Sequence, residues 1–540
     1  MQKQLETLDY IVFLVYFVVV ASYGYWIYQR KKTQEESSTD FFLAEGSLTW
    51  WAIGASLIAS NISAEQFIGM SGNGFSMGLA ISTYEWMAAA TLLVVAIFFM
   101  PIYLKNRIFT MPQFLSQRYN PTVAMIMAVF WLFLYILVNL TSILYLGALA
   151  INTISGINFT VCMISLAFFA VIITIGGMKV IGYTDVIQVF FLILGGLATT
   201  YLALNLVSEQ FGFGRDTIKG LGLIYEKSED HFHMIFQEGH PHYMSLPGLT
   251  VLIGGMWIVN LNYWGCNQYI TQRALGADLP TARAGLLFAA FLKLLMPVIV
   301  VLPGIAAYTL HQQGLFQAEM LKDGALNQDN AYPVLLNLLP TGLKGLSFAA
   351  LTAAVVASLA GKANSISTIF TLDIYRKYIN KTADEKKLVW VGRVAVVVAM
   401  ILAIGISPYM GIDKKGGFQF IQEMTGLVSP GVFAAFIMGF FWKRTNSEGA
   451  FFAIVGGFLI ALAMHNNVLP GADWTTVPFL DRMGIVFLVC VAVMIVLGLA
   501  LPDQKKGLEI DASMFRVSGG FLAGALIIVA ILTFLYSYFW

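Results

Sequence analysis

Residues 55–70 read Ala55-Ser-Leu-Ile-Ala-Ser-Asn-Ile-Ser-Ala-Glu-Gln-Phe-Ile-Gly-Met70 and lie within an apolar segment, residues 50–75, that is long enough to cross a bilayer. Polar side chains crowd into the middle of this segment: Ser60, Asn61, Ser63, Glu65 and Gln66. At membrane depth, polar groups and non-helical backbone are tolerated only where they face protein or a water-filled cavity. The pattern predicts a broken transmembrane helix that carries a binding site. The alternative is an unbroken helix whose Ser and Asn side chains join it to a neighbour.

The composition of the whole chain is that of an all-α polytopic membrane protein. Hydrophobic residues make up 58% of the 540 residues, charged residues only 11%, and the mean hydropathy is +0.76. A soluble domain has about 25% charged residues. Apolar segments long enough for one span each are found at 8–28, 50–75, 79–103, 122–150, 157–177, 184–207, 248–272, 284–310, 343–372, 388–408, 417–442, 447–466, 481–501 and 516–538, about 14 in all.

The short connections between these segments carry the charges that orient the chain. Lys and Arg fall consistently in every second connection, as at Arg30-Lys-Lys32, Arg376-Lys377 and Lys443-Arg444. Because cytoplasmic loops are enriched in Lys and Arg, both termini are predicted to lie outside. The net charge of +1 and the lack of a long basic run give no sign of a nucleic-acid partner. No obligate protein partner is evident either.

A second interruption, five spans after the first, has the sequence Gly254-Gly-Met-Trp-Ile-Val-Asn-Leu-Asn-Tyr-Trp-Gly-Cys-Asn-Gln268. Interrupted spans at corresponding places in two halves are typical of secondary transporters with inverted repeats. We therefore expect a single transporter domain over residues 1–540, with repeats at 50–207 and 248–442. Each repeat would have five spans, an odd number, so the two repeats must have opposite topology. The first span and residues 447–540 would be peripheral.

The two longest connections on the predicted outer side, residues 208–247 and 311–342, are expected to form short surface helices. The first of them holds His231, His233, His240 and His242. A metal site is one interpretation of this cluster, and an exposed polar loop is the other.

A small set of polar side chains at membrane depth forms the candidate binding site: Asn61, Gln66, Glu85, Asn260, Asn262, Lys293 and Gln422. Each is costly to leave unpaired in hydrocarbon. Either they satisfy one another, Glu85 with Lys293 foremost, or they surround a polar ligand. Amides, an acid and an ammonium offer donors and acceptors to a neutral solute with many hydroxyls, and nearby aromatic rings could stack on a sugar. A carboxylate solute would call for an Arg, which these spans lack at their centres, although helix N-termini could serve instead.

A cation site follows from similar reasoning. Unwound carbonyls near Ala59 and Ile62 are hard oxygen ligands, and Ala354, Ala357 and Ser358 share one face of a later span. Backbone oxygens and a hydroxyl, without a fixed negative charge, suit a weakly held monovalent ion. The alternative is a small-residue face that only packs against a neighbouring helix.

Several stretches resemble those of a known family: Ala55 to Met70, Tyr84-Glu-Trp86, Tyr183-Thr-Asp-Val-Ile-Gln-Val-Phe190, Asn267-Gln-Tyr-Ile-Thr-Gln-Arg273 and Asn364-Ser-Ile-Ser-Thr-Ile-Phe-Thr-Leu-Asp-Ile-Tyr375. By these motifs, the sequence is identified as a member of the solute:sodium symporter family. Within that family it most resembles the sodium/glucose cotransporter type, and there the bacterial sodium/galactose branch. The resemblance covers nearly the whole chain.

The resemblance implies a LeuT-type fold of 5+5 inverted repeats with extra peripheral helices, and sodium-driven import of a monosaccharide by alternating access. It implies sugar contacts from Asn61, Gln66, Glu85, Asn260, Lys293 and Gln422. Gates are expected at Met70, Tyr84 and Phe418 on the outer side and at Tyr263 on the inner side. The sodium ion, the one cofactor expected, would sit among Ala59, Ile62, Ala354 and Ser358. A multi-pass protein of the cell inner membrane is the expected location.

Three positions depart from the pattern of the close relatives. Ala88 stands where they have a Ser in the sugar site, and Asn262 where they have a Tyr beside the inner gate. Ala357 replaces the first of two hydroxyls at the sodium site. The first change removes a hydrogen bond worth roughly 1 kcal/mol, so the preferred sugar epimer could differ. The third change removes one hydroxyl ligand for sodium, so the number of sodium ions and their affinity are less firmly predicted than the fold.

Lys362 follows Ser358 by four residues and so lies on the same helix face, one turn nearer the cytoplasm. We hypothesise that Lys362 pairs with Asp185 and that this pair flanks the sodium exit path. The alternative is a Lys that simply reaches water in the inner cavity.

Competing functions remain open at this point. The solute could be myo-inositol, sialic acid, proline or another small metabolite, and protons could replace sodium, as Ala357 and Lys362 suggest. A sensor would require an appended signalling domain. An enzyme is not expected, because no nucleophile–base pair, metal-ligand motif or phosphate loop accompanies the buried acids.

Overall fold

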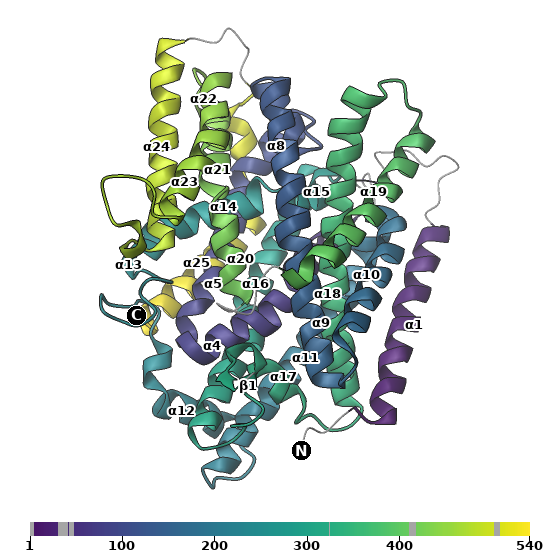
Figure 1. Cartoon of the computed structure of the whole chain (residues 1–540), viewed down its shortest axis with the longest axis vertical. Coiled ribbons are helices and arrows are strands. Elements are labelled where there is room, and N and C mark those ends of the chain that lie inside the picture. The colour runs from purple at the N-terminus through teal and green to yellow at the C-terminus, as the bar shows by residue number, and fades with distance from the viewer. Residues whose placement is uncertain (1–4, 31–41, 43–47, 323, 410–416, 502–507) are drawn as a thin grey trace.

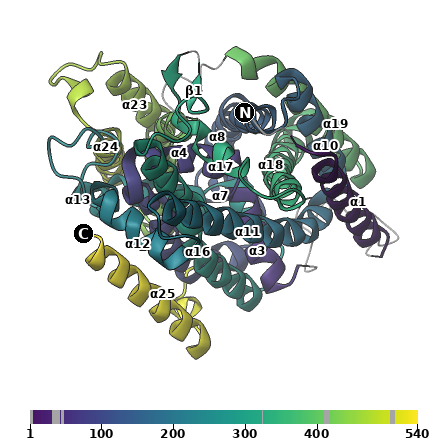
Figure 2. The same ribbon diagram turned by 90° about the horizontal axis from the view of Figure 1, so that it is seen from below.

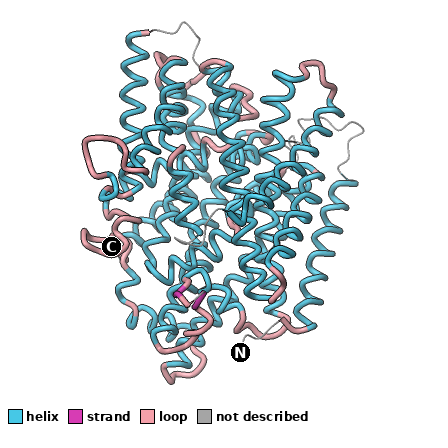
Figure 3. Tube along the Cα trace, in the orientation of Figure 1, coloured by secondary structure: helices cyan, strands magenta, loops and turns pink. Residues whose placement is uncertain are grey.

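The computed structural model describes residues 5–30, 42, 48–322, 324–409, 417–501 and 508–540, and this part of the chain is almost entirely helical (Figure 3). The first half contains α1 Thr7–Arg30, α3 Trp50–Asn61, α4 Ser71–Met77, α5 Thr83–Val94, α6 Met100–Lys105, α7 Met111–Arg118, α8 Pro121–Phe133, α9 Thr141–Ser155, α10 Phe159–Ile175, α11 Gly177–Gln210 and α12 Thr217–Lys227. Short π-helical stretches continue some of these: η1 Glu65–Met70, η3 Val95–Phe99 and η4 Leu134–Leu140.

The second half contains α13 Leu249–Ile253, α14 Gly255–Gly265, α15 Gln268–Leu275, α16 Leu279–Gln312, α17 Ala331–Leu336, α18 Leu343–Thr368, α19 Glu385–Ile406, α20 Gly417–Gly426, α21 Ser429–Phe441, α22 Ser447–Phe451, α23 Gly457–His465, α24 Phe479–Ala500 and α25 Gly519–Tyr538. The stretch η7 Ile369–Ile379 continues α18, and η2 Gly78–Ser82 and η5 Glu229–Phe232 are single 3-10 turns. The one sheet in the described residues is a hairpin of β1 Leu321–Lys322 and β2 Ala325–Leu326.

Ten of the described helices are long and apolar enough to cross a membrane, or eleven if the bent pair α20 and α21 counts as one span. The difference from the expected number has a physical reason. Several segments that are apolar in sequence are broken or short in the structure, so they fail a test based on continuous helix length. Helix α10, for example, has 17 residues, and α14 has 11.

The first predicted break is confirmed. Helix α3 ends at Asn61 because Ile62 adopts an extended conformation, with φ −82° and ψ 112°. The chain becomes helical again in η1, which begins at Glu65. The side chain of Gln66 accepts the N–H of Ser63, 3.0 Å, so it occupies a backbone donor that the break releases. Residues 62–64 are thus the hinge of this span.

The second predicted break is confirmed as well. Gly254 separates α13 from α14, with φ −126° and ψ −119°. Helix α14 ends at Gly265, and Asn267 then caps α15 by accepting the N–H of Tyr269, 3.1 Å. A third break, which the sequence analysis does not predict, bends α20 against α21 by 52°.

Helices α14, α16 and α20 lie near the centre of the bundle (Figure 1). Helix α16 packs along α3, α4 and α5, and α11 packs along α18 and α3. The apolar window of the α18 span is 89% buried, against 22% for α1 and 17% for α25. Figure 2 shows these last two helices at opposite edges of the bundle. The interior is therefore built around the broken helices and α18.

The two long connections do form short helices, as expected: α12 and η5 in one, and α17 with the β1–β2 hairpin in the other. Both ends of the chain contact them. Asp9 near the N-terminus accepts the N–H groups of Gly342 and Gly345, 2.7 and 2.9 Å. Near the C-terminus, the carbonyl of Phe539 accepts the N–H of Met234, 2.7 Å.

Candidate functional site

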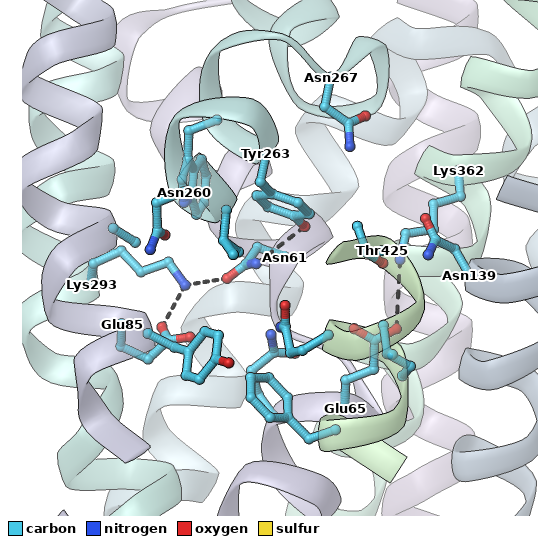
Figure 4. Close-up of a pocket in the computed structure, with 18 residues that line it drawn as sticks. Asn61, Glu65, Glu85, Asn139, Asn260, Tyr263, Asn267, Lys293, Lys362 and Thr425 are labelled. Carbon is cyan, nitrogen blue, oxygen red and sulfur yellow. Dashed lines mark hydrogen bonds and ion pairs between the residues drawn. The ribbon is translucent and has the colours of Figure 1, made fainter. Parts of the chain in front are cut away.

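One cavity at the break gathers all six polar residues expected to contact a solute (Figure 4). Its volume is about 60 Å³. The six come from six different helical segments: Asn61 from α3, Gln66 from η1, Glu85 from α5, Asn260 from α14, Lys293 from α16 and Gln422 from α20. Segments far apart in the sequence therefore converge on one site.

Lys293 is the centre of the hydrogen bonding in this cavity. Its ammonium donates to the carboxylate of Glu85 and to the side-chain oxygen of Asn61. The side chains of Lys293 and Glu85 are only 1% and 3% exposed. A buried charge of this kind is tolerated when it is paired and hydrogen-bonded. The expected partnership of Glu85 with Lys293 is thus confirmed.

Asn61 connects this ion pair to an aromatic side chain of the second broken span. Its Nδ2 donates to the hydroxyl of Tyr263, 3.2 Å, while its oxygen accepts from Lys293. Asn61 is the last residue of α3, so the break itself directs this side chain into the cavity. The two broken helices are thereby joined across the site by a side-chain amide.

Three of the four expected gate residues line the cavity: Tyr84, Phe418 and Tyr263. The rings of Tyr84 and Phe418 meet edge to face, with centroids 5.0 Å apart and an interplanar angle of 90°. The fourth, Met70, is fully buried at the end of η1 and does not line the cavity. A ring of Trp264 also lines the cavity, and the Lys293 ammonium lies 5.1 Å from its centroid.

Asn262 does not take part in this site. Its Nδ2 donates to the hydroxyl of Ser429 on α21, 3.1 Å, and the residue is absent from the cavity lining. It faces away because Asn260 and Tyr263 on the same helix occupy the side that points into the cavity. Counting polar residues along a span does not distinguish its faces, so the grouping of Asn262 with the cavity residues was wrong.

Helices α3 and α18, which carry most of the expected cation ligands, contact each other near the end of α3. The hydroxyl of Ser358 donates to the carbonyl of Ser60, 3.0 Å, and shares a hydrogen bond with the hydroxyl of Tyr269, 3.2 Å. At the break, the N–H of Ser63 donates to the side chain of Gln66 and not to the carbonyl of Ala59, one turn before it. Likewise, the N–H of Gln66 donates to the carbonyl of Ser63 and not to that of Ile62. The break therefore releases two backbone oxygens from helical pairing at this point.

The expected ion pair of Lys362 with Asp185 is wrong. The Lys362 ammonium lies 3.6 Å from Oε1 of Glu65 (Figure 4). Asp185 instead accepts the hydroxyl of Ser56 on α3, 2.5 Å, and Ser56 accepts from Nε of Arg273, 2.9 Å. The physical reason is the break: it turns η1 so that Glu65 reaches α18, while Asp185 faces the unbroken part of α3.

Four polar residues that line the cavity are missing from the expected contacts: Glu65, Asn139, Asn267 and Thr425. Glu65 belongs to the polar cluster of residues 60–66, so its burial was foreseeable although its role was not. Asn139 is a single amide in an otherwise apolar segment. Polar residues inside membrane spans are usually functional, so this amide is a signal that could have found it. Asn267 lies just after the end of α14, and Thr425 lies just before the bend between α20 and α21, and only the structure shows which way those breaks turn.

Two histidines of the connection 208–247 pack against aromatic rings. His231 stacks on Tyr308, with centroids 3.8 Å apart, and its Nε2 lies 3.0 Å from the carbonyl of Phe75. His240 stacks on Phe236 at 4.0 Å. Burial lowers the pKa of both histidines. In the described part of the chain, no group of three or more His, Cys, Asp or Glu residues is arranged to hold a metal ion.

Comparisons with known proteins agree with this architecture. The family model described as "Sodium:solute symporter family" matches residues 41–457. A protein named sodium/glucose cotransporter from Vibrio parahaemolyticus is 46% identical over 547 residues, covering 99% of both chains. The human sodium/myo-inositol cotransporter 2 is 36% identical and covers 85% of this chain and 70% of its own.

Among solved structures, a Na+-coupled sialic acid symporter in a substrate-bound outward-open state superposes with a TM-score of 0.79. It covers 93% of this chain and all of its own at 22% identity, so this likeness shows the fold alone. Mhp1, a nucleobase-cation-symport-1 family transporter, gives a TM-score of 0.52 at 13% identity and covers 92% of this chain and 99% of its own. The family and these relatives are cation-coupled transporters and not enzymes. With the family model matching most of its length, the chain belongs to the sodium:solute symporter family, as a multi-pass membrane transporter.

Proposed function

We propose that this protein imports a neutral monosaccharide, of the galactose or glucose type, together with sodium. The observation that carries the proposal is the convergence of six polar side chains from six helical segments on one cavity. Amide groups, a carboxylate and an ammonium alternate there as acceptors and donors, which suits a solute with many hydroxyls. The full-length relative named sodium/glucose cotransporter supports the same class of solute.

The charge balance of the cavity favours a neutral solute over an acid. Two lysines line it, Lys293 and Lys362, and each already has a carboxylate partner, Glu85 and Glu65 respectively. A carboxylate solute needs an uncompensated cation or a bidentate Arg. Sialic acid and proline are therefore weaker candidates. Myo-inositol is also a neutral polyol, and relatives named sodium/myo-inositol cotransporter make it the second candidate.

The sodium site that we propose lies at the released carbonyls of the first break. Carbonyl oxygens of Ala59, Ile62 and Ala354 and the hydroxyl of Ser358 would hold the ion. Hard oxygen donors without a formal charge fit a weakly bound monovalent cation. The donor set fits because the break leaves the oxygens of Ala59 and Ile62 unpaired beside α18. Ala357 supplies no hydroxyl here, so a single sodium ion per cycle is proposed.

Transport would proceed by alternating access in a LeuT-type fold with 5+5 inverted repeats, residues 50–207 and 248–442, within about 14 spans. A solute enters from outside and contacts the six polar residues; Tyr84 and Phe418, backed by Met70, then close over it. Movement of Tyr263 on α14 opens the inner side. Helix α14 ends two residues after Tyr263, at Gly265, and this end gives Tyr263 room to move. The location would be a cell inner membrane with both termini outside.

Sodium and solute are expected to stabilise the same arrangement of the break, so each must raise the affinity for the other. The test is uptake of radiolabelled galactose into proteoliposomes with an inward sodium gradient, in competition with unlabelled glucose, myo-inositol, sialic acid and proline. Strong competition by glucose, weaker competition by myo-inositol and none by the two acids is the expected order. Competition by sialic acid or proline ahead of the sugars would overturn the solute class.

A further inference from the structure

Lys362 and Glu65 form a buried ion pair at the edge of the solute cavity (Figure 4). The ammonium and carboxylate atoms lie 3.6 Å apart, and the side chains are 4% and 10% exposed. The Lys362 ammonium also lies 5.1 Å from the ring centroid of Tyr269. Both charges are largely buried, so each depends mainly on the other for compensation.

The pair joins α18 to the far side of the first break. Glu65 is the first residue of η1, directly after the hinge at residues 62–64. On the near side of the hinge, Ser358 of α18 donates to the carbonyl of Ser60, 3.0 Å. Because Lys362 follows Ser358 by one helical turn, α18 fastens the chain on both sides of the break.

The same geometry places the pair beside the proposed ion ligands. Tyr269 contacts both parts: its ring lies under the Lys362 ammonium and its hydroxyl is 3.2 Å from the hydroxyl of Ser358. One turn of helix separates the two α18 residues, a rise of about 6 Å. In a buried site, charges at such separations interact strongly because little solvent screens them. A sodium ion held by Ser358 would therefore feel both Lys362 and Glu65.

We propose that the Lys362–Glu65 ion pair sets the sodium affinity of this transporter by balancing the charge beside the ion site. This inference rests on the proposed function. Lys362 repels a bound cation and Glu65 attracts it, and the pair leaves the donor set formally neutral. The Lys362 ammonium thus provides part of the contact between α18 and η1, the segment after the break.

Removing one partner at a time has opposite consequences. In Lys362→Met the carboxylate of Glu65 is left without its cation, so the half-saturating sodium concentration falls by about tenfold. In Glu65→Gln the ammonium is uncompensated, and this concentration rises by about the same factor. In the double variant both charges are absent and the value returns to within about threefold of the parent. A merely structural role would weaken sodium binding in both single variants.

The experiment is equilibrium binding of ²²Na⁺ to the purified full-length protein without sugar, followed by a scintillation proximity assay. The matched control is the ion pair Lys377–Asp373, 2.7 Å, in η7, the stretch that continues α18 beyond Lys362. Lys377→Met and Asp373→Asn change the charge equally but lie about 20 Å away along the helix, so they leave the sodium affinity unchanged. Lys362→Gln replaces Lys362→Met should the latter fail to fold, and must shift the affinity in the same direction.

Opposite shifts in the two single variants, with recovery in the double variant, support the inference. Shifts in the same direction, or no shift in either, overturn it. Failure of the proposed function itself is distinguishable, because the parent protein would then bind no ²²Na⁺ under conditions in which the variants are compared.

Discussion

Ala88 lines the cavity one helical turn after Glu85 and presents only a methyl group to it. The variant Ala88→Ser adds a hydroxyl at a position where a bound sugar lies within hydrogen-bonding distance in the proposed pose. One such hydrogen bond contributes about 1 kcal/mol, so galactose should bind about fivefold more tightly. Equilibrium binding of labelled galactose, with glucose as the competitor, measures this. Ala90→Ser on the same helix, outside the cavity lining, is the control and should leave the affinity unchanged.

Glu85→Gln leaves the Lys293 ammonium buried beside a neutral amide. Removing one partner of a buried ion pair costs about 3–5 kcal/mol, so a marked fall in the thermal stability of the purified protein is expected, together with loss of sugar binding. Size-exclusion chromatography after heating gives the stability. The double variant Glu85→Gln/Lys293→Gln removes both charges and should regain most of the stability without regaining binding. A single variant as stable as the parent would contradict the proposed energetics of the pair.

At the scale of residues, sequence reasoning identified the cavity but not all of its pairings. Polar side chains at membrane depth are too costly to be placed at random, which is why all six expected contacts line one cavity. The partner of Lys362 could not be deduced, because Glu65 reaches α18 only through the turn of the chain at the break. A sequence shows that a helix breaks, but not the direction in which it continues.

Gly69 on η1 approaches α20 more closely than any other residue type could. A Cβ at this position would lie 2.8 Å from Cβ of Phe418 and 2.9 Å from its backbone nitrogen. In Gly69→Ala, η1 and α20 must therefore separate, and the contact of Tyr84 with Phe418 should loosen. Faster labelling of Ile421→Cys, a cavity-lining position on α20, by a membrane-impermeant maleimide is the expected result.

The native cysteines give little background in this experiment, because all three are buried. The control is Gly222→Ala on α12, where an added Cβ meets no atom within 4 Å. Labelling in the control should match that of the parent. An equal labelling rate in Gly69→Ala would show that the approach of η1 to α20 does not hold the outer side closed.

The connection that contains His231, residues 208–247, is expected to pack less tightly against α16 at low pH. Burial holds the pKa of His231 below its ordinary value of 6.5, and the neutral ring stacks on Tyr308. A pKa lowered by folding means that the stabilisation is complete above pH 6.5 and is lost as the pH falls below it. Hydrogen exchange in residues 228–236, corrected for the intrinsic rate, should be faster at pH 5.5 than at pH 7.5. His231→Gln, which does not titrate, should remove this difference.

At the scale of elements, glycines and amides inside apolar segments predicted the first two breaks correctly, because they are poor continuations of a membrane helix. The sequence analysis does not predict the bend between α20 and α21, although Gly426 ends the first helix and Pro430 is the second residue of the next. Proline cannot donate a backbone hydrogen bond and favours the first turn of a helix, so it is the signal that could have found this bend. The surrounding run of apolar residues concealed it.

At the scale of the whole molecule, the family and the helical membrane architecture were predictable from the sequence. Composition alone requires a membrane protein, and the motifs at the breaks are those of the sodium:solute symporters. The number of spans is harder to predict, because hydropathy counts apolar residues whereas the described helices include broken spans that are short individually. The expected repeat symmetry of residues 50–207 and 248–442 remains a prediction.

The most direct test of sodium-coupled sugar import is accumulation of labelled galactose against its own gradient in proteoliposomes. With an inward sodium gradient, the internal galactose concentration should rise transiently above the external one and return to equality as the gradient dissipates. With equal sodium on both sides, or with potassium in its place, only equilibration should occur. Accumulation that persists when sodium is replaced by potassium and follows an imposed proton gradient would contradict the account.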